Sequence, residues 1–469
     1  MTKDGGLGGV AAPKGTEPGA PEAANPSKKD GGPANHSSQG MWGVSPAGPL
    51  RGDVTVAGSK NAVTKHMVAA LLADEPSTIL NAPKVGDVDI TSGMLQALGA
   101  GVAIEDDAIT VDPTSLTESR VPVSYSGLNR IPILLVGPLL HRVNEAFIPM
   151  VGGDRIGSRP VNLHVDALRA LGAEVEVTPD GLEAKALALH GARLRLPFPS
   201  VGATENILLT AALADGRTIL ENAAIEPEVV ELALFLQRMG ARIELRPDRQ
   251  FVIEGVEKLS GATHRLGGDR IEAFSYLVAG LATQGRVRVF GCQQGRMVTA
   301  ITMLARMGAR FEITDESIAA EGGRLKGAAL QTNPHPGFMT DWHPPLVVLF
   351  TQAEGMSVMH ETVFEDRLGY VDALREMGAE IEVFDQCLAG EVCRFHETHY
   401  LHSAVVKGGS KLRGAEIEAS DVRGGFAYLI AAAAAEGESV LTGVHHLERG
   451  YDRTFERFSE LGLGLTTLN

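Results

Sequence analysis

Cysteine, aromatic residues and long apolar runs are all scarce in this chain of 469 residues. The three cysteines, Cys292, Cys387 and Cys393, are an odd number for a disulfide framework and lack the spacing of a metal site. We therefore expect each of them to be a small buried hydrophobic residue. Phe, Trp and Tyr supply only 5% of the residues, although apolar residues of all kinds supply 44%. The core must then be filled mainly by aliphatic side chains.

Membrane and nucleic-acid partners are both disfavoured. The sequence has no run of about 18 uncharged apolar residues, and its N-terminus lacks the charged and then apolar pattern of a secretory signal. We therefore expect a cytoplasmic protein with no membrane partner. The net charge of −16 argues against a nucleic acid. It leaves room for a small anionic substrate, because a cleft can be locally positive on an acidic protein.

The chain is rich in repetition. A helical stretch ending in Leu-Gly-Ala or Met-Gly-Ala, followed by an alternating, strand-like run, occurs six times, the last time in degenerate form. The copies lie about 70 residues apart, which is too far for one turn of a solenoid, so each copy is a folding unit. The glycines of the six copies are Gly99, Gly172, Gly240, Gly308, Gly378 and Gly462.

A second repeated pattern predicts how the units fold. An apolar helix, a small polar turn and a strand follow one another in segments such as 207–220, 276–289 and 428–441. These helices are apolar on nearly all sides, so we expect them to be buried, with the sheets outside. The prediction is an α/β (α+β) fold of six units, which divide naturally into two domains of three. Residues 1–39 have almost no large apolar side chains and are predicted to be a disordered tail.

Three places in the sequence are not explained by packing. Lys60 lies beside the start of a helix, which is a favourable position for an anion. Residues 149–164 contain paired glycines, Asp154 and Arg159, the composition of a hinged active-site loop. Asp341 lies among proline and aromatic residues, where partial desolvation would raise its pKa and suit it to act as a base.

Other charged and polar residues carry less information. Taken alone, an arginine after a strand is most often a solvated charge, and this applies to Arg367, Arg423 and Arg449. Histidines do not show the spacing of metal ligands, so we expect no metal site. The histidines considered are His335, His343, His445 and His446.

Several motifs carry a resemblance to a known family. From about Val44 to its C-terminus, the chain resembles the enolpyruvyl transferases, in particular the branch that acts on uridine nucleotides. The motifs are GSKNA at 58–62, GGDRIGSRPVNLH at 152–164, SVGATEN at 200–206, ENAAIEPEVVELALFL at 221–236, DRIEA at 269–273, TDW at 340–342, ETVFEDR at 361–367 and ERGYDR at 448–453.

The resemblance implies a fold and a reaction. The fold would be a two-domain inside-out α/β barrel, with one domain of residues 60–268 and a second of 40–59 plus 269–469. The reaction would transfer the enolpyruvyl group of phosphoenolpyruvate to a hydroxyl of a uridine nucleotide, by addition and then elimination with release of phosphate. The expected acceptor is the 3-hydroxyl of UDP-N-acetylglucosamine. The resemblance implies no cofactor and no metal.

The resemblance also assigns residues. The expected catalytic residues are Asp154, Asp341 (the base for the acceptor hydroxyl), Lys60 and Arg423. The residues that match the family's phosphoenolpyruvate arginines are Arg130 and Arg159 at the phosphate and Arg423 and Arg449 at the carboxylate. Arg367 matches a further arginine that is coupled to the conformation of the family's site. Residues matching those that hold the acceptor are Asn61, Asn162, Ser200, Val201, Gly202 and Val363. Bidentate arginines are the natural clamp for a donor with a phosphate and a carboxylate.

Departures from the family leave alternatives open. Asp154 stands where most members carry a cysteine. A carboxylic acid donates a proton to carbon 3 only if its pKa is raised. A carboxylate is also a weaker target than a thiolate for the epoxide fosfomycin, so we expect this enzyme to resist fosfomycin. Asn162 replaces the usual Asp, and the run 197–199 is less polar. The acceptor could instead be UMP, as in nucleoside antibiotic synthesis, or the chain could be an inactive nucleotide-binding paralogue. A shikimate phosphate acceptor is disfavoured by the loop 152–164.

Overall fold

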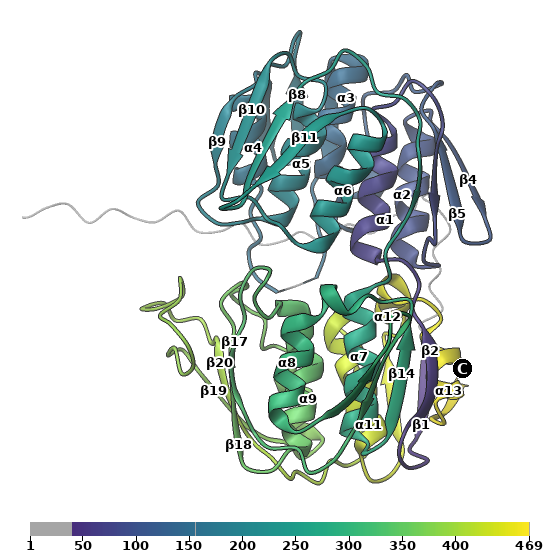
Figure 1. Cartoon of the computed structure of the whole chain (residues 1–469), viewed down its shortest axis with the longest axis vertical. Helices are drawn as coiled ribbons and strands as arrows, with labels where there is room; N and C mark the ends of the chain where they lie inside the picture. The colour runs from purple at the N-terminus through teal and green to yellow at the C-terminus, as the bar shows by residue number, and fades with distance from the viewer. Residues whose placement is uncertain (1–39, 155, 469) are drawn as a thin grey trace, which may run out of the picture. The chain divides into compact units, whose positions relative to one another are not determined.

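The computed structural model describes residues 40–154 and 156–468 (Figure 1). The predicted tail, residues 1–39, lies outside the described residues, so its disorder stays a prediction. Within the described ranges the chain forms 23 β-strands and 13 α-helices. Among these helices, none has both the length and the apolar character needed to cross a membrane.

The strands form six sheets, five of four strands and one of three. In one sheet the order of paired strands is β13 (Thr263–Arg265), β3 (Ser77–Leu80), β5 (Ala108–Asp112) and β4 (Gly101–Glu105). The three-stranded sheet has the order β6 (Glu145–Pro149), β8 (Gly181–Lys185) and β7 (Glu174–Thr178). A third sheet has the order β11 (Arg242–Arg246), β12 (Gln250–Glu254), β10 (Arg217–Glu221) and β9 (Arg193–Arg195). A fourth sheet has the order β15 (Arg310–Ile313), β16 (Ser317–Glu321), β14 (Arg286–Phe290) and β2 (Arg51–Thr55). A fifth has the order β17 (Ala329–Gln331), β18 (Met356–His360), β20 (Ser403–Lys407) and β19 (Glu380–Phe384). The sixth has the order β21 (Glu416–Glu418), β22 (Ser439–Thr442), β1 (Met41–Ser45) and β23 (Gly464–Leu468).

Five of the sheets share a plan of three antiparallel strands extended by one parallel strand. The parallel pairs are β3 with β13, β10 with β9, β14 with β2, β18 with β17 and β22 with β21. In the three-stranded sheet the parallel partner is reduced to a single bridge between Arg120 and Phe147. The sixfold repeat in the sequence therefore corresponds to six copies of one sheet design.

Each repeat also ends its helix in the same way. The glycine of each Gly-Ala phrase is left-handed, with φ between 95° and 110°, a conformation that glycine adopts without a steric penalty. The residue after it donates its N–H to the carbonyl five residues earlier, which closes the last helical turn. These bonds join Ala100 to Leu95, Ala173 to Leu168, Ala241 to Leu236, Ala309 to Leu304, Ala379 to Leu374 and Leu463 to Phe458.

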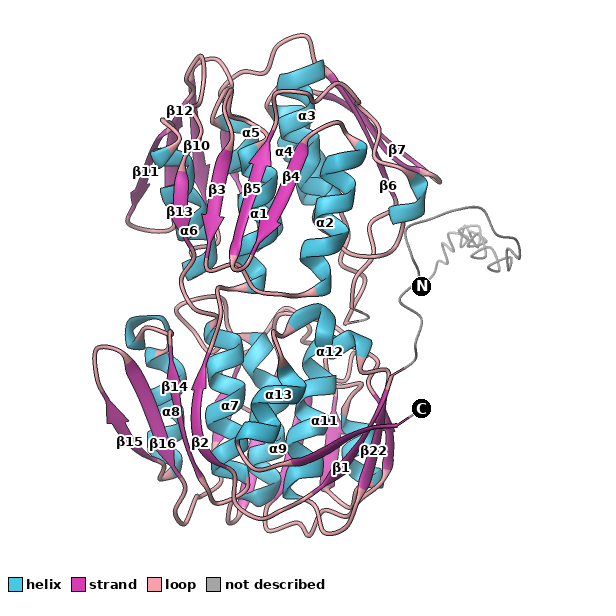
Figure 2. Cartoon of the chain, turned by 90° about the vertical axis from the view of Figure 1, so that its right-hand side faces the viewer, coloured by secondary structure: helices cyan, strands magenta, loops and turns pink. Residues whose placement is uncertain are grey.

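The helices lie inside the sheets, as predicted (Figure 2). All of α7 (Arg270–Ala282) is buried, and so is nearly all of α9 (His343–Gln352) and α11 (Val422–Ala434), which pack on one another. In the other half, α1 (Lys60–Ala70) and α5 (Val201–Ala211) pack against α6 (Pro227–Arg238). The remaining helices are α2 (Gly86–Ala97), α3 (Val136–Val143), α4 (Asn162–Ala170), α8 (Val298–Met307), α10 (Val371–Glu376), α12 (His445–Gly450) and α13 (Thr454–Glu460).

The buried apolar side chains form two separate hydrophobic clusters. One draws on residues from Ala62 to Leu266. The other draws on residues 42–56 and 271–463. We call the corresponding parts of the chain the first and second halves; the exact domain boundaries stay a prediction.

The chain passes between the halves twice, and the two passages are paired. Gly58 and Gly268 form an antiparallel bridge, in which Ser59 N donates to Gly267 O at 3.0 Å and Asp269 N donates to Ala57 O at 2.9 Å. A side chain on Gly58 would collide with the Asn81 carbonyl oxygen, 2.1 Å from an added Cβ. This close crossing brings the first residues of α1 and α7 together.

Candidate active site

A cavity of about 460 Å³ is lined by residues of both halves. This volume lies in the range of pockets that hold small-molecule ligands. Every candidate site residue lines it, although they come from widely separated segments: Lys60, Asn61, Arg130, Asp154, Arg159, Asn162, Ser200, Val201, Gly202, Asp341, Val363, Arg367, Arg423 and Arg449. The fold therefore gathers all the predicted positions into one space.

Lys60 is the first residue of α1, as expected for an anion site. Its backbone N–H donates to Asp269 Oδ2 at 3.1 Å, and its ammonium Nζ lies 2.8 Å from Asp87 Oδ2. Asp87 is buried in the first turn of α2, and its Oδ1 lies 3.6 Å from Arg449 Nε of the second half. Asp87 therefore holds two cations, one from each half. Sequence reasoning missed Asp87, because its role appears only once α1, α2 and α12 come together.

Arg130 and Arg159 both lie close to Gly153 of the glycine-rich loop. A Cβ added to Gly153, whose φ is 116°, would lie 3.1 Å from Arg159 Nη1 and 3.5 Å from Arg130 Cγ. Burial and then repulsion from Arg159 lower the pKa of Arg130 to about 10. Two guanidinium groups held this close gain from an anion placed between them.

Asp341 lies in the short 3₁₀ helix η4 (Thr340–Trp342) and pairs with Arg423 at the start of α11. Arg423 Nε lies 2.7 Å from Asp341 Oδ1. Asp421 caps α11 by accepting from the N–H groups of Arg423 and Gly424, both at 3.0 Å, and its Oδ1 lies 3.6 Å from Arg367 Nη1. These contacts fix both guanidinium groups at the wall of the cavity.

Two donors of this cluster are left for a ligand. Arg423 Nη1 and Arg367 Nε are buried and have no hydrogen-bond partner among the described residues. Buried polar atoms are almost always paired, so unpaired cationic donors beside a cavity indicate an anionic ligand.

The pKa expected for Asp341 is wrong. Burial alone would raise the pKa of this carboxyl, but the charges of Arg423 and Arg367 outweigh burial and lower it. The sequence showed the apolar neighbours of Asp341 and not the arginines that fold against it. Asp341 is therefore ionised at neutral pH and ready to accept a proton.

Asp154 also has a lowered pKa. Burial alone would raise the pKa of this carboxyl. The charges of Arg449, then of Lys60 and of the neighbouring arginines, together lower the pKa by more than burial raises it. Its Oδ1 lies 2.5 Å from Arg449 Nη2, so the loop of the first half is tied to the second half. The condition for proton donation, a raised pKa, is not met in this arrangement.

The predicted acceptor residues Asn162, Ser200, Val201, Gly202 and Val363 line the same cavity from other segments than the donor cations, and we call this part of its lining the acceptor end. Asn162 begins α4 and is exposed, and Ser200 caps α5 by accepting from Ala203 N at 3.4 Å. A Cβ on Gly202 would lie 3.2 Å from the His164 ring, so a larger residue would crowd this wall. Val363 N donates to the buried Glu361 Oε1 at 2.7 Å.

Two residues at this end were not singled out as contacts by the sequence. The Arg394 guanidinium lies 4.7 Å from the ring centroid of Phe198 in the other half, and it donates to the Val363 carbonyl. Glu361 Oε2 also accepts from Thr340 Oγ1 at 2.9 Å, so one carboxylate braces both Val363 and the neighbour of Asp341. Phe198 had appeared in the sequence only as a departure, and Arg394 had given no signal.

Comparison with known proteins places this chain in a family. The family model described as EPSP synthase (3-phosphoshikimate 1-carboxyvinyltransferase) matches residues 44–458. The chain belongs to this enolpyruvyl transferase family. A relative from Protochlamydia amoebophila named UDP-N-acetylglucosamine 1-carboxyvinyltransferase is 44% identical over 89% of this chain and 92% of its own length. One of the same name from Chlamydia pneumoniae is 42% identical over 88% and 92%.

A solved enolpyruvyl transferase has the same fold. The crystal structure of the enolpyruvyl transferase NikO from Streptomyces tendae matches 91% of this chain and 98% of its own length, with a TM-score of 0.80 and 23% identity. The predicted inside-out arrangement of helices and sheets is thus confirmed for this enolpyruvyl transferase.

The expectation for the cysteines is partly wrong. Cys292 is buried as predicted, but Cys387 and Cys393 are only half-buried, and their Sγ atoms lie 3.7 Å apart. Of the four histidines considered, His343 pairs with the buried Glu361, with Nδ1 3.2 Å from Oε2, which is a structural contact. The thiols of Cys387 and Cys393 meet through a loop that the sequence pattern did not resolve.

Proposed function

We propose that this enolpyruvyl transferase moves the enolpyruvyl group of phosphoenolpyruvate to the 3-hydroxyl of UDP-N-acetylglucosamine and releases phosphate. The observation that carries the proposal is the cation set from both halves around Asp341 and the two unpartnered arginine donors. The acceptor is supported by relatives named for it at 40–44% identity over 88–90% of this chain. The reaction would take place in the cytoplasm, where the sequence composition led us to expect the protein.

The two anionic groups of the donor would be shared between the halves. Arg130 and Arg159 are assigned to the phosphate, because an anion between them relieves their mutual repulsion. Arg423 and Arg449 are assigned to the carboxylate. Lys60, which is linked to Arg449 through Asp87, would contact the phosphate or the intermediate. Fixed cations of this kind also stabilise the charge that develops on the leaving phosphate.

The addition step needs a base at the acceptor and a proton at carbon 3. Asp341, which is ionised, would accept the proton of the acceptor hydroxyl as its oxygen bonds to carbon 2 of phosphoenolpyruvate. Carbon 3 takes up a proton in the same step, which gives a tetrahedral ketal. In the elimination, carbon 3 loses a proton, the double bond re-forms, and the bond from carbon 2 to the phosphate oxygen breaks.

Asp154 is proposed to exchange the proton of carbon 3 only when the donor is bound. The Arg449 charge that lowers its pKa would then be partly neutralised by the donor carboxylate. Burial, the largest single effect on this group, would then raise its pKa. The substrate itself would therefore convert a carboxylate that bridges the halves into a carboxylic acid.

UMP remains the second candidate acceptor because of two residues at the acceptor end. Asn162 presents an amide where the family usually has a carboxylate, and Phe198 offers an aromatic face beside Arg394. Both changes affect how a nucleotide is read and leave the donor cations unchanged. An inactive paralogue that only binds nucleotide is disfavoured by that unchanged cation set and by the ionised Asp341.

Phosphate release in the presence of phosphoenolpyruvate distinguishes these candidates. The purified chain is incubated with UDP-N-acetylglucosamine, UMP or shikimate 3-phosphate, and the product is identified by mass. We expect phosphate and an enolpyruvyl product with UDP-N-acetylglucosamine. Release with UMP alone would reverse the order of the two acceptors, and nucleotide binding without any release would indicate the inactive paralogue.

A further inference from the structure

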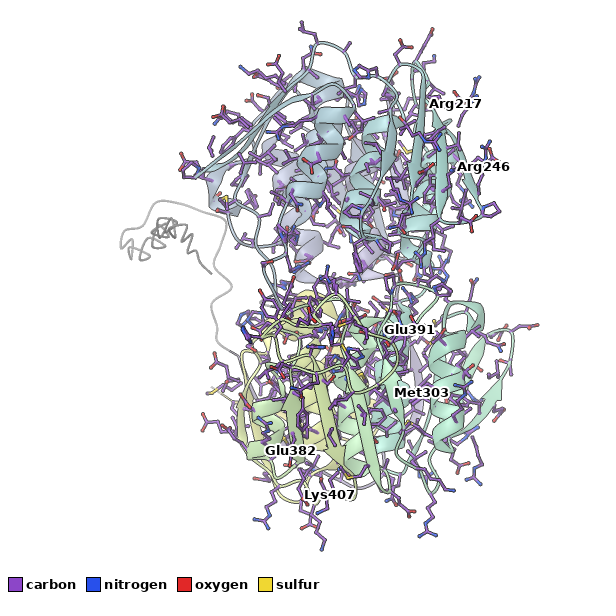
Figure 3. The ribbon with its side chains drawn as sticks, turned by 90° about the vertical axis from the view of Figure 1, so that its left-hand side faces the viewer. Arg217, Arg246, Met303, Glu382, Glu391 and Lys407 are labelled. Carbon is purple, nitrogen blue, oxygen red and sulfur yellow. The ribbon has the colours of Figure 1, made fainter. Side chains whose placement is uncertain are left out.

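Four metal-binding side chains meet outside the cleft. His360 ends β18, His402 immediately precedes β20, and Cys387 and Cys393 belong to the connection 385–402 between β19 and β20. One ligand atom from each of the four lies within 4.8 Å of those of the others. Figure 3 labels Glu391 of this connection at the opposite end of the sheet from Lys407 of β20.

Two of the distances between ligand atoms match those of a tetrahedral zinc site. Cys387 Sγ lies 3.7 Å from Cys393 Sγ and 3.5 Å from His402 Nε2. With Zn–S bonds of about 2.3 Å and Zn–N bonds of about 2.0–2.1 Å, tetrahedral angles place two sulfurs about 3.8 Å apart and a sulfur and a nitrogen about 3.6 Å apart. A disulfide would need its sulfurs at about 2.05 Å. The two thiols are therefore spaced as ligands of one ion.

Both histidines are oriented to offer Nε2. His360 Nδ1 bonds to the Ala389 carbonyl, and His402 Nδ1 bonds to the Tyr400 carbonyl at 2.7 Å. A carbonyl only accepts, so each Nδ1 carries the proton and each Nε2 keeps a free lone pair. This carbonyl contact is the usual second interaction of a histidine that binds a metal.

His360 supplies an independent sign that a ligand belongs here. The residue is fully buried, and its Nε2 has no hydrogen-bond partner among the described residues. Phe395 N donates to Cys393 Sγ at 3.3 Å, which holds this thiol in place. A buried, unpaired imidazole nitrogen beside two thiols indicates a cation between them.

The connection 385–402 has little else to hold it. It contains no helix or strand among its described residues, and connections of more than about 12–15 residues without secondary structure are uncommon. Several of its large apolar side chains are exposed: Leu388, Val392, Tyr400 and Leu401. Within the connection, all of whose residues are described, Phe395 is the one large apolar side chain that is buried, so apolar burial comes from a single residue.

We propose that His360, Cys387, Cys393 and His402 bind one structural Zn²⁺ ion, which fixes the connection that carries Arg394. Four protein ligands close the coordination sphere and leave no open position for a reacting water, so the ion is structural and not catalytic. Arg394 directly follows Cys393 and reaches the acceptor end of the cavity at Val363 and Phe198. The zinc site itself does not depend on which acceptor is used. The effect of zinc on the KM for the nucleotide rests on the proposed function.

The first test is the metal content of the full chain. The protein is purified with a reductant, dialysed against a chelator, incubated with Zn²⁺ alone, desalted and analysed by mass spectrometry of the metal. We expect about one zinc per chain in the wild type and in the matched control Cys292→Ser. The double variant Cys387→Ser/Cys393→Ser and the single variant His402→Gln should each lose at least about 10-fold in retained zinc.

Cobalt gives a readout that does not depend on variants. Co²⁺ added to the chelated wild type should give the visible absorption of a tetrahedral ion and a thiolate charge-transfer band, and Zn²⁺ should displace both. Zinc at well below one equivalent in the wild type, equal zinc in all variants, or a Cys387–Cys393 disulfide in the reduced preparation would each overturn the proposal. This holds even if a serine variant fails to fold.

Kinetics then test the connection to the cleft. Removal of zinc should raise the KM for the nucleotide about 10-fold and leave kcat nearly unchanged, and Arg394→Ala should do the same while retaining its zinc. If zinc is bound but no acceptor is turned over, the proposed function fails and the metal site stands. If turnover is normal but zinc is not retained, only the metal site fails.

Discussion

The two ends of the cleft are built in different ways. Among the donor residues, Lys60 and Arg423 start buried helices and are held by carboxylates. Among the acceptor residues, Asn162 and Val201 also start helices, but Phe198 and Arg394, which contact each other, come from loops. Side chains held at helix termini keep one geometry, which suits charge stabilisation. Loop residues are free to differ between proteins of one fold. We therefore expect the donor residues to determine the reaction and the acceptor residues to determine which nucleotide is used.

The largest effect should come from the proposed base. Asp341→Asn keeps the size of the side chain but cannot accept the hydroxyl proton, so we expect kcat to fall by about 10³-fold or more. Nucleotide affinity, measured by calorimetry, should change by less than about 3-fold, because Asp341 contacts Arg423 and not the acceptor-end residues. An active Asp341→Asn enzyme would remove Asp341 from the mechanism.

A smaller loss should follow a change in the donor clamp. Arg423→Lys keeps one positive charge but loses the unpartnered Nη1 donor, so we expect kcat/KM for phosphoenolpyruvate to fall about 10²-fold. The matched control is Arg413→Lys, an exposed arginine that does not line the cavity, which should be close to wild type. Equal kinetics in both variants would mean that Arg423 is only a partner of Asp341.

At the acceptor end, the expected effect is on binding alone. Phe198→Ala removes the ring over which the exposed Arg394 guanidinium lies, and a cation–π contact at an exposed site corresponds to a change of up to about 5-fold. The KM for the nucleotide should rise by that factor with kcat unchanged. A fall in kcat with an unchanged KM would contradict the division of the cleft into a donor end and an acceptor end.

The smallest effect is expected from fosfomycin. Asp154 occupies the position at which most family members carry a thiol, and a carboxylate is a poor target for alkylation by the epoxide. Preincubation should therefore cause no time-dependent loss of activity. Asp154→Cys should acquire such a loss, with protection by substrate. Rapid inactivation of the wild type would show that another nucleophile, or Asp154 itself, reacts.

The sequence predicts the layers of the fold and the lining of the cavity, but not the contacts between the side chains of the site. The repeats and the all-apolar helices predicted the layers, because the period and the polarity of a segment reflect its own burial. The motifs predicted which residues line the cavity. The pKa of Asp341 and the links made by Asp87 could not be predicted, because they depend on side chains brought together from distant segments.

The cysteine and histidine cluster illustrates the same limit. Cys387 and Cys393 are six residues apart, but His360 ends β18 and His402 immediately precedes β20, two strands that the fold pairs. No spacing in the sequence joins these four residues. Strand pairing within one sheet brings them together.

The most direct test of the central claim is a crystal structure of the Asp341→Asn variant with phosphoenolpyruvate and UDP-N-acetylglucosamine bound. We expect the donor phosphate between Arg130 and Arg159, its carboxylate at Arg423 and Arg449, and the acceptor 3-hydroxyl facing residue 341. A donor bound by the cations of one half alone, or an acceptor hydroxyl turned away from residue 341, would contradict it.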